Sequence, residues 1–287
     1  MPQTLYEFLC IFIIYAFLGW CTEVAYAALD LGKFVNRGFL NGPYCPIYGV
    51  GVLIVIDVLT PLKDNLLILF AGSFLLTSVL EYLTGWILEK VFHNKWWDYS
   101  EFPFNIKGYV CLKFSILWGL ACSFIMLVLH PMIYNFVLFF PKKVGIVLLI
   151  AVFLAFAVDC IFTVSTILNL NRHLKVINEV AEKLRNISDE IGENIYENVA
   201  EAIEKKEIAE EIQREIQSNV QQGIEKKKAE YEKLVKRHKE LMETRIFGQE
   251  RLLKAFPGMK STDYNESLQK LRAHLKELVK MGKEKED

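Results

Sequence analysis

Apolar residues fill most of the first 170 positions of the chain in long segments, a pattern typical of helices that cross a membrane. Each segment is long enough to cross a hydrocarbon core of about 30 Å. The first one has no basic residue before it and no small-residue cleavage site, which indicates a membrane helix and not a signal peptide. A further apolar stretch, residues 131–141, is bounded by prolines, and we expect it to lie in the membrane interface. We predict five membrane spans, at residues 5–29, 44–62, 66–92, 109–129 and 144–170.

Beyond Asn171 the pattern changes to apolar residues that recur mostly at every fourth position in a charged background, as in an amphipathic helix. We expect this helix to continue from the fifth span through residues 177–224. Because the apolar residues recur mostly at intervals of four, the apolar stripe rotates around the helix axis along the chain. A sustained heptad repeat would not show this rotation. The helix therefore either breaks, with Gly192 and Gly223 as candidates, or meets different neighbours along its length. Two more helices are predicted, at residues 225–255 and from a cap at residues 261–263 to about residue 281.

The predicted fold is all-α, with a polytopic membrane bundle of about five helices at residues 1–171 and a cytoplasmic helical or coiled-coil tail at residues 172–287. Of 33 basic and 34 acidic residues, 24 of each lie beyond Asn171, so both parts are close to neutral. This balance gives no reason to expect a nucleic-acid partner. The six cysteines all precede the tail and none forms a C-x-x-C pair, which favours buried thiols over a disulfide or zinc framework.

Lysine and arginine in the short loops indicate the orientation, because cytoplasmic loops carry an excess of them. If the N-terminus is outside, the inner loops and the tail hold most of these residues. We therefore predict a multi-pass protein of the plasma membrane with its N-terminus outside and its tail in the cytoplasm. The inner loops would contain Lys33, Arg37, Lys90, Lys95 and Lys107, against Lys63, Lys142 and Lys143 outside.

Polar side chains of the predicted spans gather in their inner halves. Charges in a membrane segment cost several kcal/mol and usually face a partner or a cavity, so the pattern predicts a polar vestibule open to the cytoplasm. Some of these residues are also close enough to helix ends to reach headgroup water by snorkelling, and this alternative stays open for Glu23, Glu89 and Lys113. The residues concerned are Glu23, Glu81, Glu89, Lys113, Ser115 and Asp159.

The most unusual connection is residues 36–51, which combine an arginine with asparagines, prolines and glycines before the chain enters an apolar segment. Irregular backbone at membrane depth is tolerated only where protein buries it or where it lines a water-filled cavity. We therefore expect a site here, with Asn36 and Arg37 as candidate contacts. Arg37 either holds a substrate or neutralises nearby carboxylates in a structural ion pair.

An internal repeat at an offset of 66 residues supports this interpretation. The motif G-W-x-x-E occurs at residues 19–23 and 85–89, and a glycine and a cysteine match at the same offset. These matches predict two parallel helix–loop–helix copies, as in some transporters. The second loop, residues 95–108, would then correspond to the first.

Two interpretations of this second loop remain open. Its tandem tryptophans, Trp96 and Trp97, suit the membrane interface, where amphipathic rings lie at headgroup level. Alternatively, Asp98 and Asn105 point into the vestibule opposite Arg37.

These motifs resemble a known family of bacterial multi-pass membrane proteins, the putative ABC-transporter type IV permeases. The resemblance covers roughly residues 5–170 and includes W-W-D-Y-S at residues 96–100 and N-x-x-G-x-x-C-L-x-x-S-x-x-W-G at residues 105–119. The phrase R-L-L-K-A-F-P at residues 251–257 is similar to tails of bacterial members. The family implies a transport component, and it supplies no catalytic residues.

Three functions fit the sequence. The first is a permease subunit for a small molecule or ion, which would need a separate ATPase subunit because the chain has no G-x-x-x-x-G-K-[ST] phosphate-binding loop. The second is a membrane enzyme acting on a lipid or lipid-linked substrate, with carboxylates as acid and base and Arg37 on a phosphate. The third is a scaffold or sensor that signals through the tail. Besides membrane lipids, we expect a homo-oligomer through the membrane domain or the tail, no cofactor and no confident metal site.

Overall fold

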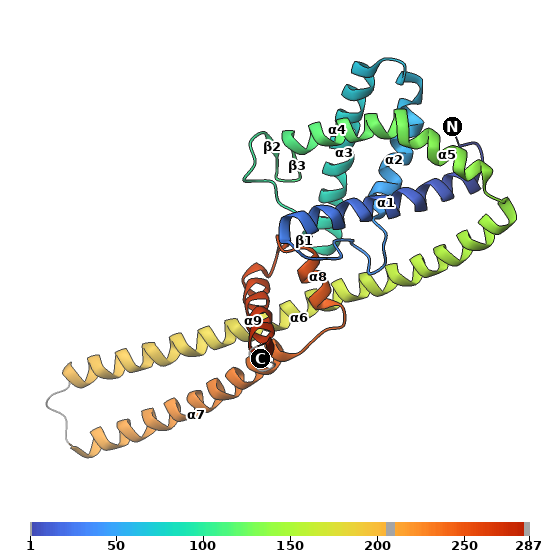
Figure 1. Ribbon diagram of the computed structural model, residues 1–287. Helices are drawn as coiled ribbons and strands as arrows, with labels where there is room; N and C mark the ends of the chain where they lie inside the picture. The colour runs from blue at the N-terminus through green and yellow to red at the C-terminus, as the bar shows by residue number, and fades with distance from the viewer. Residues whose placement is uncertain (1, 205–209, 284–287) are drawn as a thin grey trace. The chain divides into compact units, whose positions relative to one another are not determined.

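The computed structural model describes residues 2–204 and 210–283, and most of these are helical (Figure 1). This confirms the predicted all-α membrane fold. The strands found in the described residues are two residues long and form two antiparallel pairs. They are β1 (Asn94–Lys95) with β4 (Lys260–Ser261), and β2 (Asn105–Ile106) with β3 (Val110–Cys111).

The chain forms two compact units, which we describe separately. The first unit contains the residues up to Leu168 together with Ile246–Asp263, and the second contains Asn169–Arg245 together with the residues from Tyr264 onward. The first unit holds α1 (Leu5–Leu31), α2 (Pro46–Leu59), η1 (Thr60–Leu62), α3 (Leu66–Phe92), α4 (Leu112–Phe124), the π-helical turn η2 (Ile125–Leu129), α5 (His130–Phe139) and α8 (Gln249–Ala255). Helix α6 (Lys142–Glu204) contributes to both units, and the second also holds α7 (Glu210–Glu243) and α9 (Asn265–Lys283).

Four helical stretches of the described residues are long and apolar enough to cross a membrane: Leu5–Asp30, Leu66–Phe92, Leu112–Phe139 and Lys142–Glu193. The predicted span at residues 44–62 is instead the shorter apolar helix Pro46–Leu62. At 1.5 Å per residue it is roughly 25 Å long, less than the thickness of the hydrocarbon core. The stretch at residues 131–141, predicted to lie apart in the interface, continues the span that begins at Leu112, because η2 joins α4 to α5.

Local side-chain chemistry explains where the membrane helices begin and end. The Thr4 hydroxyl accepts a hydrogen bond from the Glu7 amide at the start of α1, and Asn65 accepts from the amides of Leu67 and Ile68 at the start of α3. Both are N-caps that satisfy donors of the first turn. Helix α1 ends at Gly32, whose φ of 65° is the left-handed conformation that favours glycine at a helix end.

Helices α1 and α2 pack closely, as do α3 and α4, and these two pairs make the most extensive helix contacts of the first unit. The α1–α2 contact depends on glycine: a Cβ at Gly49 would lie 2.6 Å from the Phe12 carbonyl oxygen. The core between these helices is apolar except for one tyrosine. It consists of Ile11, Tyr15, Val52, Val55, Ile56, Leu59, Leu69, Cys122 and Met126.

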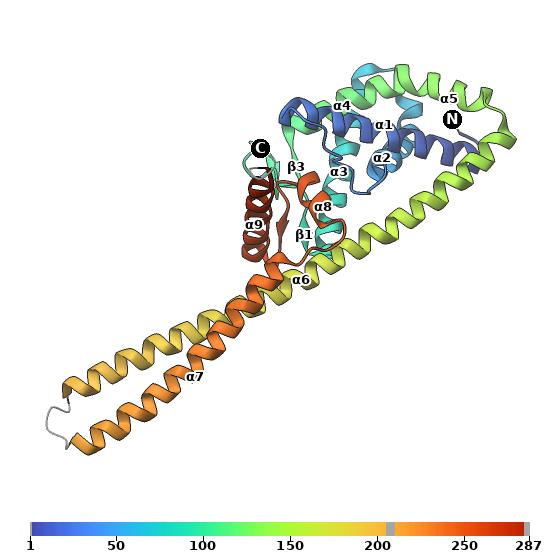
Figure 2. The ribbon, with the colours of Figure 1, turned by 60° about the horizontal axis from the view of Figure 1, so that its bottom comes forward.

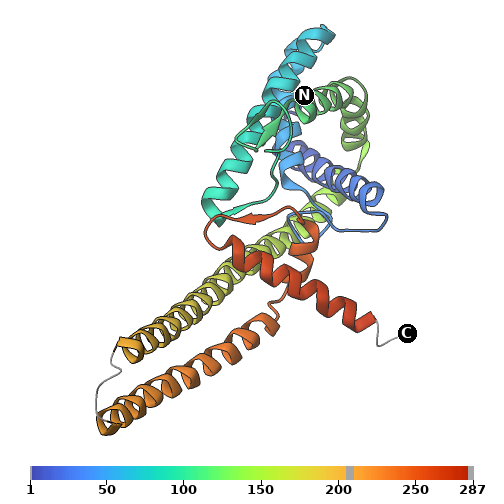
Figure 3. The same ribbon diagram turned by 90° about the vertical axis from the view of Figure 1, so that its left-hand side faces the viewer.

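In the second unit, α7 runs back alongside α6 in all three views (Figures 1, 2 and 3). Two contacts hold this hairpin: Lys227 Nζ lies 2.7 Å from Glu190 Oε2, and His173 Nε2 lies 2.9 Å from the Leu241 carbonyl oxygen. Helix α9 joins α6 through Ser267, whose hydroxyl is 3.3 Å from Asn178 Oδ1.

The tail helices follow the predicted pattern in part. Helix α6 continues from the fifth span without a break as far as Glu204, and residues 205–209 of the predicted stripe lie outside the described residues. Gly192 and Gly223 lie inside α6 and α7, so neither ends a helix. The predicted single helix at residues 225–255 is wrong, because α7 ends at Glu243 and α8 starts at Gln249, after Gly248 with a φ of 77°.

Candidate functional site

The loop between α1 and α2 is organised by its first asparagine. Asn36 Oδ1 accepts hydrogen bonds from Trp20 Nε1 at 2.8 Å and from the Gly38 amide at 3.1 Å, and its Nδ2 donates to the Asn41 carbonyl at 2.7 Å. Both polar atoms of this side chain thus take part in folding the loop, which indicates a structural role for Asn36.

Asp159 of α6 anchors the far end of the same loop. Its Oδ1 accepts from the Asn41 amide at 3.1 Å and from Asn41 Nδ2 at 2.7 Å, and its Oδ2 accepts from the Gly42 amide at 2.6 Å. Thr163, one turn further on, accepts from Asn41 Nδ2 at 3.0 Å. These donors satisfy the hydrogen-bonding capacity of the buried carboxylate oxygens, which explains how a membrane helix can hold this residue.

Arg251 of α8 binds the middle of the loop. Its Nη1 donates to the carbonyls of Gly38 and Leu40, both at 2.9 Å, and its Nη2 donates to the Phe39 carbonyl at 3.1 Å. Burial lowers the pKa of the Arg251 guanidinium, and the nearby Asp159 opposes this effect. One guanidinium therefore satisfies three consecutive carbonyls that have no strand or helix to pair with.

Fixing the loop in this way places Arg37 beside α1. Arg37 Nε lies 3.7 Å from Glu23 Oε2, which is an ion-pair distance and too long for a hydrogen bond. The guanidinium carbon lies 5.5 Å from the Tyr26 ring centroid, within cation–π range. Arg37 Nε is buried and has no hydrogen-bond partner among the residues that the structure describes.

Glu23 has a second, stronger partner in Tyr48 of α2, whose hydroxyl donates to Glu23 Oε1 at 2.6 Å. The Tyr48 ring packs edge-on against Trp118, with the ring centroids 5.5 Å apart. A similar contact joins Glu81 of α3 to Tyr99 of the α3–α4 loop, whose hydroxyl lies 3.3 Å from Glu81 Oε1. Glu81 Oε2 is buried and, within the described parts of the chain, has no hydrogen-bond partner.

These two contacts belong to one group. Burial raises the pKa of Tyr99, and the charges of Glu81 and Glu23 raise it further, which places both carboxylates within electrostatic reach of the same hydroxyl. The Tyr99 ring also stacks on Phe114 at 4.8 Å. We call Glu23, Tyr48, Glu81 and Tyr99 the carboxylate–tyrosine cluster.

Other candidate residues have partners of their own outside this cluster. Glu89 accepts a hydrogen bond of 2.8 Å from the Tyr109 hydroxyl. Burial, followed by this bond, raises the pKa of Tyr109 to about 12. The Lys113 ammonium lies over the rings of Phe102 and Phe114, at 5.6 and 5.8 Å from their centroids.

Asp98 and Asn105 are likewise occupied locally. The Asp98 carboxylate contacts Lys95 Nζ at 3.0 Å and Lys260 Nζ at 2.6 Å, and its side chain is only 12 % exposed. Burial alone would raise the pKa of Asp98, but hydrogen bonds from Lys260, Lys95 and Ser100 outweigh it and hold the pKa well below its usual value. Asn105 Nδ2 donates to the carbonyls of Ser100 and Phe102 within its own loop. The structure therefore does not group either residue with Arg37.

The remaining candidate, Ser115, is buried in the α3–α4 contact, where its hydroxyl accepts from the Ser78 hydroxyl at 2.8 Å.

The cysteines and glycines that match in the internal repeat also occupy similar structural positions. Cys45 and Cys111 each precede the first residue of a helix, and the glycines three residues before them each lie against an aspartate. A Cβ at Gly42 would lie 3.2 Å from Asp159 Oδ2, and one at Gly108 would collide with Asp98 Oδ1.

Sequence reasoning did not include three residues that the structure brings to the site: Tyr48, Tyr99 and Arg251. Tyr48 lies two positions after the proline that starts α2, and Tyr99 lies inside the W-W-D-Y-S motif. A lone tyrosine carries no spacing signal, so neither could be paired with a carboxylate beforehand. Arg251 lies in a tail motif that had been noticed, but its partners are more than 200 residues away.

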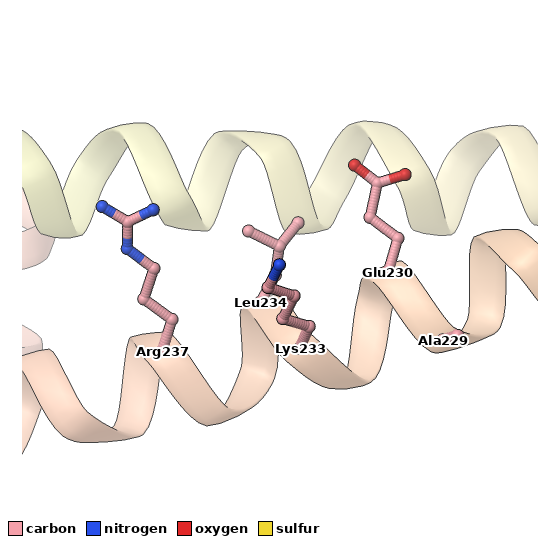
Figure 4. A pocket seen from close by; sticks show the side chains of 5 residues that line it. All are labelled: Ala229, Glu230, Lys233, Leu234 and Arg237. Atoms are coloured by element: carbon pink, nitrogen blue, oxygen red, sulfur yellow. The ribbon is translucent and has the colours of Figure 1, made fainter.

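Metal-binding groups and pockets are the other features that could indicate a ligand. Across residues 2–204 and 210–283, no group of three or more His, Cys, Asp or Glu is arranged to hold a metal ion. One pocket lies on α7 in the second unit, and Figure 4 shows the side chains of Glu230, Leu234 and Arg237 directed toward the neighbouring helix. It is lined by Ala229, Glu230, Lys233, Leu234 and Arg237, and its mixed charges point to no ligand class.

Comparison with known proteins gives one clear result. A family model described as "Putative ABC-transporter type IV" matches residues 10–164, which is more than half of the chain. No solved structure matches. Together with the four helical stretches of the described residues that are apolar enough to span a bilayer, the match makes this a membrane-embedded, transporter-related protein. The chain belongs to the family "Putative ABC-transporter type IV".

Proposed function

We propose that the protein is the permease subunit of a transporter for a small molecule or ion, and that the carboxylate–tyrosine cluster is where the solute contacts it. The observation that carries the proposal is that Glu23 and Glu81, from two different membrane helices, each accept a hydrogen bond from a tyrosine hydroxyl. Carboxylates inside membrane helices are costly, and they usually mark solute or ion pathways.

The charges of the cluster favour a particular kind of solute. Arg37 lies beside Glu23 but makes no hydrogen bond to it, and the neighbours of Glu81 are the neutral side chains of Tyr99 and Trp118, with Glu81 Oε2 buried and without a geometric hydrogen-bond partner in the described structure. Two carboxylates against one guanidinium leave an excess of negative charge. A cation, or a solute with hydrogen-bond donors, would satisfy that excess.

Energy would come from a separate subunit. The sequence contains no G-x-x-x-x-G-K-[ST] loop, so the chain has no means of this kind for holding ATP phosphates. We propose that an ATPase subunit binds on the cytoplasmic side, that the N-terminus lies outside, and that the cluster opens toward the cytoplasm. The excess of Lys and Arg in the α1–α2 and α3–α4 loops supports this orientation.

The test uses Glu81→Gln, which keeps the size and hydrogen-bonding capacity of the side chain and removes its charge. A deletion strain is complemented with the wild-type gene or with the variant, and solutes in cells and medium are compared by untargeted mass spectrometry. We expect Glu81→Gln to reproduce the solute profile of the deletion strain while its amount in the membrane stays at the wild-type level. Glu101→Gln, an exposed carboxylate outside the cluster, is the matched control and should restore the wild-type profile.

Complete restoration by Glu81→Gln would contradict the site assignment. A solute profile that does not change when the gene is deleted would contradict the transport function itself.

A further inference from the structure

The tail motif at residues 251–257 lies in a segment that the proposed solute site leaves unexplained. Residues Ile246–Asp263 belong to the first unit, although the chain on both sides of them belongs to the second. This segment, which we call the strap, contains the helix α8 and the strand β4. Its side chains Leu252 and Met259 are fully buried, so the strap is a packed part of the protein and not a loose connection.

The first part of the strap holds the α1–α2 loop. Arg251 donates hydrogen bonds to three consecutive backbone carbonyls of this loop, the first of which belongs to Gly38. Gly38 directly follows Arg37, whose Nε lies 3.7 Å from Glu23 Oε2. Backbone that is fixed one residue away restricts where the Arg37 side chain can lie. The strap therefore helps to position the cation beside the first carboxylate of the carboxylate–tyrosine cluster.

The middle of the strap is joined to both inner loops through aromatic rings. Phe256 packs edge-on against Trp96 of the α3–α4 loop, with the ring centroids 4.9 Å apart. Trp96 also packs against Phe39 of the α1–α2 loop, at 5.0 Å, and is itself buried. Edge-to-face aromatic pairs at these distances attract one another. Trp96 thus connects the two loops to each other and to the strap.

The last part of the strap pairs with the start of the α3–α4 loop. Strand β4 of the strap is antiparallel to β1, with Lys260 opposite Lys95. The Thr262 amide extends this pairing by donating to the His93 carbonyl at 2.9 Å. Beside it, His93 Nδ1 lies 3.1 Å from Asp263 Oδ2. Backbone hydrogen bonds and side-chain contacts together fix the register of the strap on this loop.

The side chain of Lys260 extends this pairing toward the second carboxylate of the cluster. Lys260 Nζ lies 2.6 Å from Asp98 Oδ2, and the other oxygen, Asp98 Oδ1, accepts from the Ser100 amide at 3.1 Å. Asp98 and Ser100 flank Tyr99, whose hydroxyl contacts Glu81. The strap therefore approaches both carboxylates in the same way: one of its charged side chains binds the loop next to the residue that contacts the carboxylate.

We propose that the strap is a positioning element of the solute site, which holds the α1–α2 and α3–α4 loops in a fixed relation to each other. In doing so it places Arg37 beside Glu23 and Tyr99 beside Glu81. One segment of the tail then governs the contacts of both carboxylates. The role of the strap in transport rests on the proposed function, whereas its role in ordering the two loops does not.

Cysteines of the chain report on each loop separately. Cys45 ends the α1–α2 loop and Cys111 ends the α3–α4 loop, and both are buried, while Cys122 lies in the apolar core of the first unit. The full-length protein in detergent micelles is treated with N-ethylmaleimide, and the modification rate of each cysteine is measured by peptide mass spectrometry. A buried thiol reacts when its surroundings open. Cys45 and Cys111 therefore measure the opening of the two loops, and Cys122 measures the opening of the helix core.

Each charged side chain of the strap should protect the cysteine of its own loop. We expect Arg251→Met to raise the modification rate at Cys45 at least about threefold relative to Cys122 in the same molecule, because it removes charge-assisted hydrogen bonds that hold the loop. Lys260→Met should raise the rate at Cys111 relative to Cys122 by a similar factor of at least about three, since it removes the cation from Asp98.

Phe256→Ala should raise the rates at both loop cysteines, because it removes the ring that packs on Trp96. Lys254→Met, which changes an exposed residue of α8, is the control and should give the wild-type rates. Unchanged rates at both loop cysteines in the two charge-removing variants would overturn the proposal. An equal rise at all three cysteines would also overturn it, since the strap would then stabilise the fold as a whole without ordering the loops.

The link to the solute site is tested in the complementation assay used for Glu81→Gln. Lys260→Met should shift the solute profile toward that of the deletion strain at an unchanged amount in the membrane. Lys260→Arg keeps a cation at Asp98 and should restore the wild-type profile. A wild-type profile for Lys260→Met, in an assay where Glu81→Gln fails to complement, would refute the role of the strap in transport and leave the proposed solute site standing. Complementation by Glu81→Gln would refute that site, and the cysteine rates would still decide whether the strap orders the loops.

Discussion

At the scale of single residues, the α1–α2 loop is held by two opposite charges that contact its backbone directly. Asp159 accepts from the amides of Asn41 and Gly42, and Arg251 donates to three carbonyls just before them. A loop with no regular secondary structure must satisfy its backbone groups in some way. Because Arg37 belongs to this loop, its distance from Glu23 depends on both of these side chains.

Replacing Arg251 with methionine should therefore destabilise the first unit. The change leaves three carbonyls without their charged donor, and hydrogen bonds to charged groups contribute about 1.5–3 kcal/mol to stability. We expect a lower melting temperature in detergent micelles for Arg251→Met. Lys254→Met is the control on the same helix, since Lys254 forms only a surface pair with Glu250, and such pairs contribute about 0–1 kcal/mol. Equal melting temperatures for the two variants would show that Arg251 does not hold the loop.

Asp98 should make stability depend on pH in the acid range. Its folded-state pKa lies below the unfolded value of about 4, so its contribution is present above that value and is lost as the pH falls through the folded pKa. Asp98→Asn should lower the melting temperature at pH 7. The difference from wild type should shrink at pH values below about 4, where the carboxylate becomes protonated in the unfolded state, and should disappear once the folded carboxylate is protonated at still lower pH. A difference that stays constant from pH 7 to pH 3 would mean that the charge of Asp98 does not stabilise the protein.

At the scale of elements, two glycines of α2 should respond oppositely to the same substitution. A Cβ at Gly49 would press on the Phe12 carbonyl, whereas the atom nearest a Cβ at Gly51 is Leu80 Cδ1 at 4.0 Å. We expect Gly49→Ala to destabilise the α1–α2 pair by about 1–3 kcal/mol through overpacking. Gly51→Ala should be neutral or stabilise by up to about 1 kcal/mol, since alanine favours helix. Thermal unfolding of the two variants side by side tests this, and a destabilised Gly51→Ala with an unchanged Gly49→Ala would refute the packing.

Helix type and membrane character could be predicted from the sequence because both depend on local apolar content. The shorter second helix could not, since the apolar pattern at residues 44–62 continues through the prolines that delimit Pro46–Leu62. The π-turn was also missed, because the apolar residues of Ile125–Leu129 look the same in either helix type. At the site, carboxylates such as Glu81 could be identified from the sequence because a charge inside a membrane helix is energetically costly. Their tyrosine partners could not be identified, because these contacts depend on the tertiary structure.

At the scale of the whole molecule, the proposed orientation makes a direct prediction. In that proposed orientation, which rests on the positive charge of the loops, the C-terminus lies in the cytoplasm. A green fluorescent protein fused to the C-terminus should fluoresce, and alkaline phosphatase fused at the same position should be inactive, since the first folds in the cytoplasm and the second needs export. Active phosphatase with no fluorescence would reverse the proposed orientation.

The most direct test of the transport function asks whether the protein has an ATPase partner. The chain carries an affinity tag, is extracted from its native membranes in a mild detergent, and the copurifying proteins are identified and assayed for ATP hydrolysis. A similarly abundant tagged membrane protein from the same cells serves as the control. We predict that a subunit with a phosphate-binding loop copurifies in stoichiometric amount and hydrolyses ATP. Recovery of the protein with no ATPase above the control level would contradict its assignment as the permease subunit of an ATP-driven transporter.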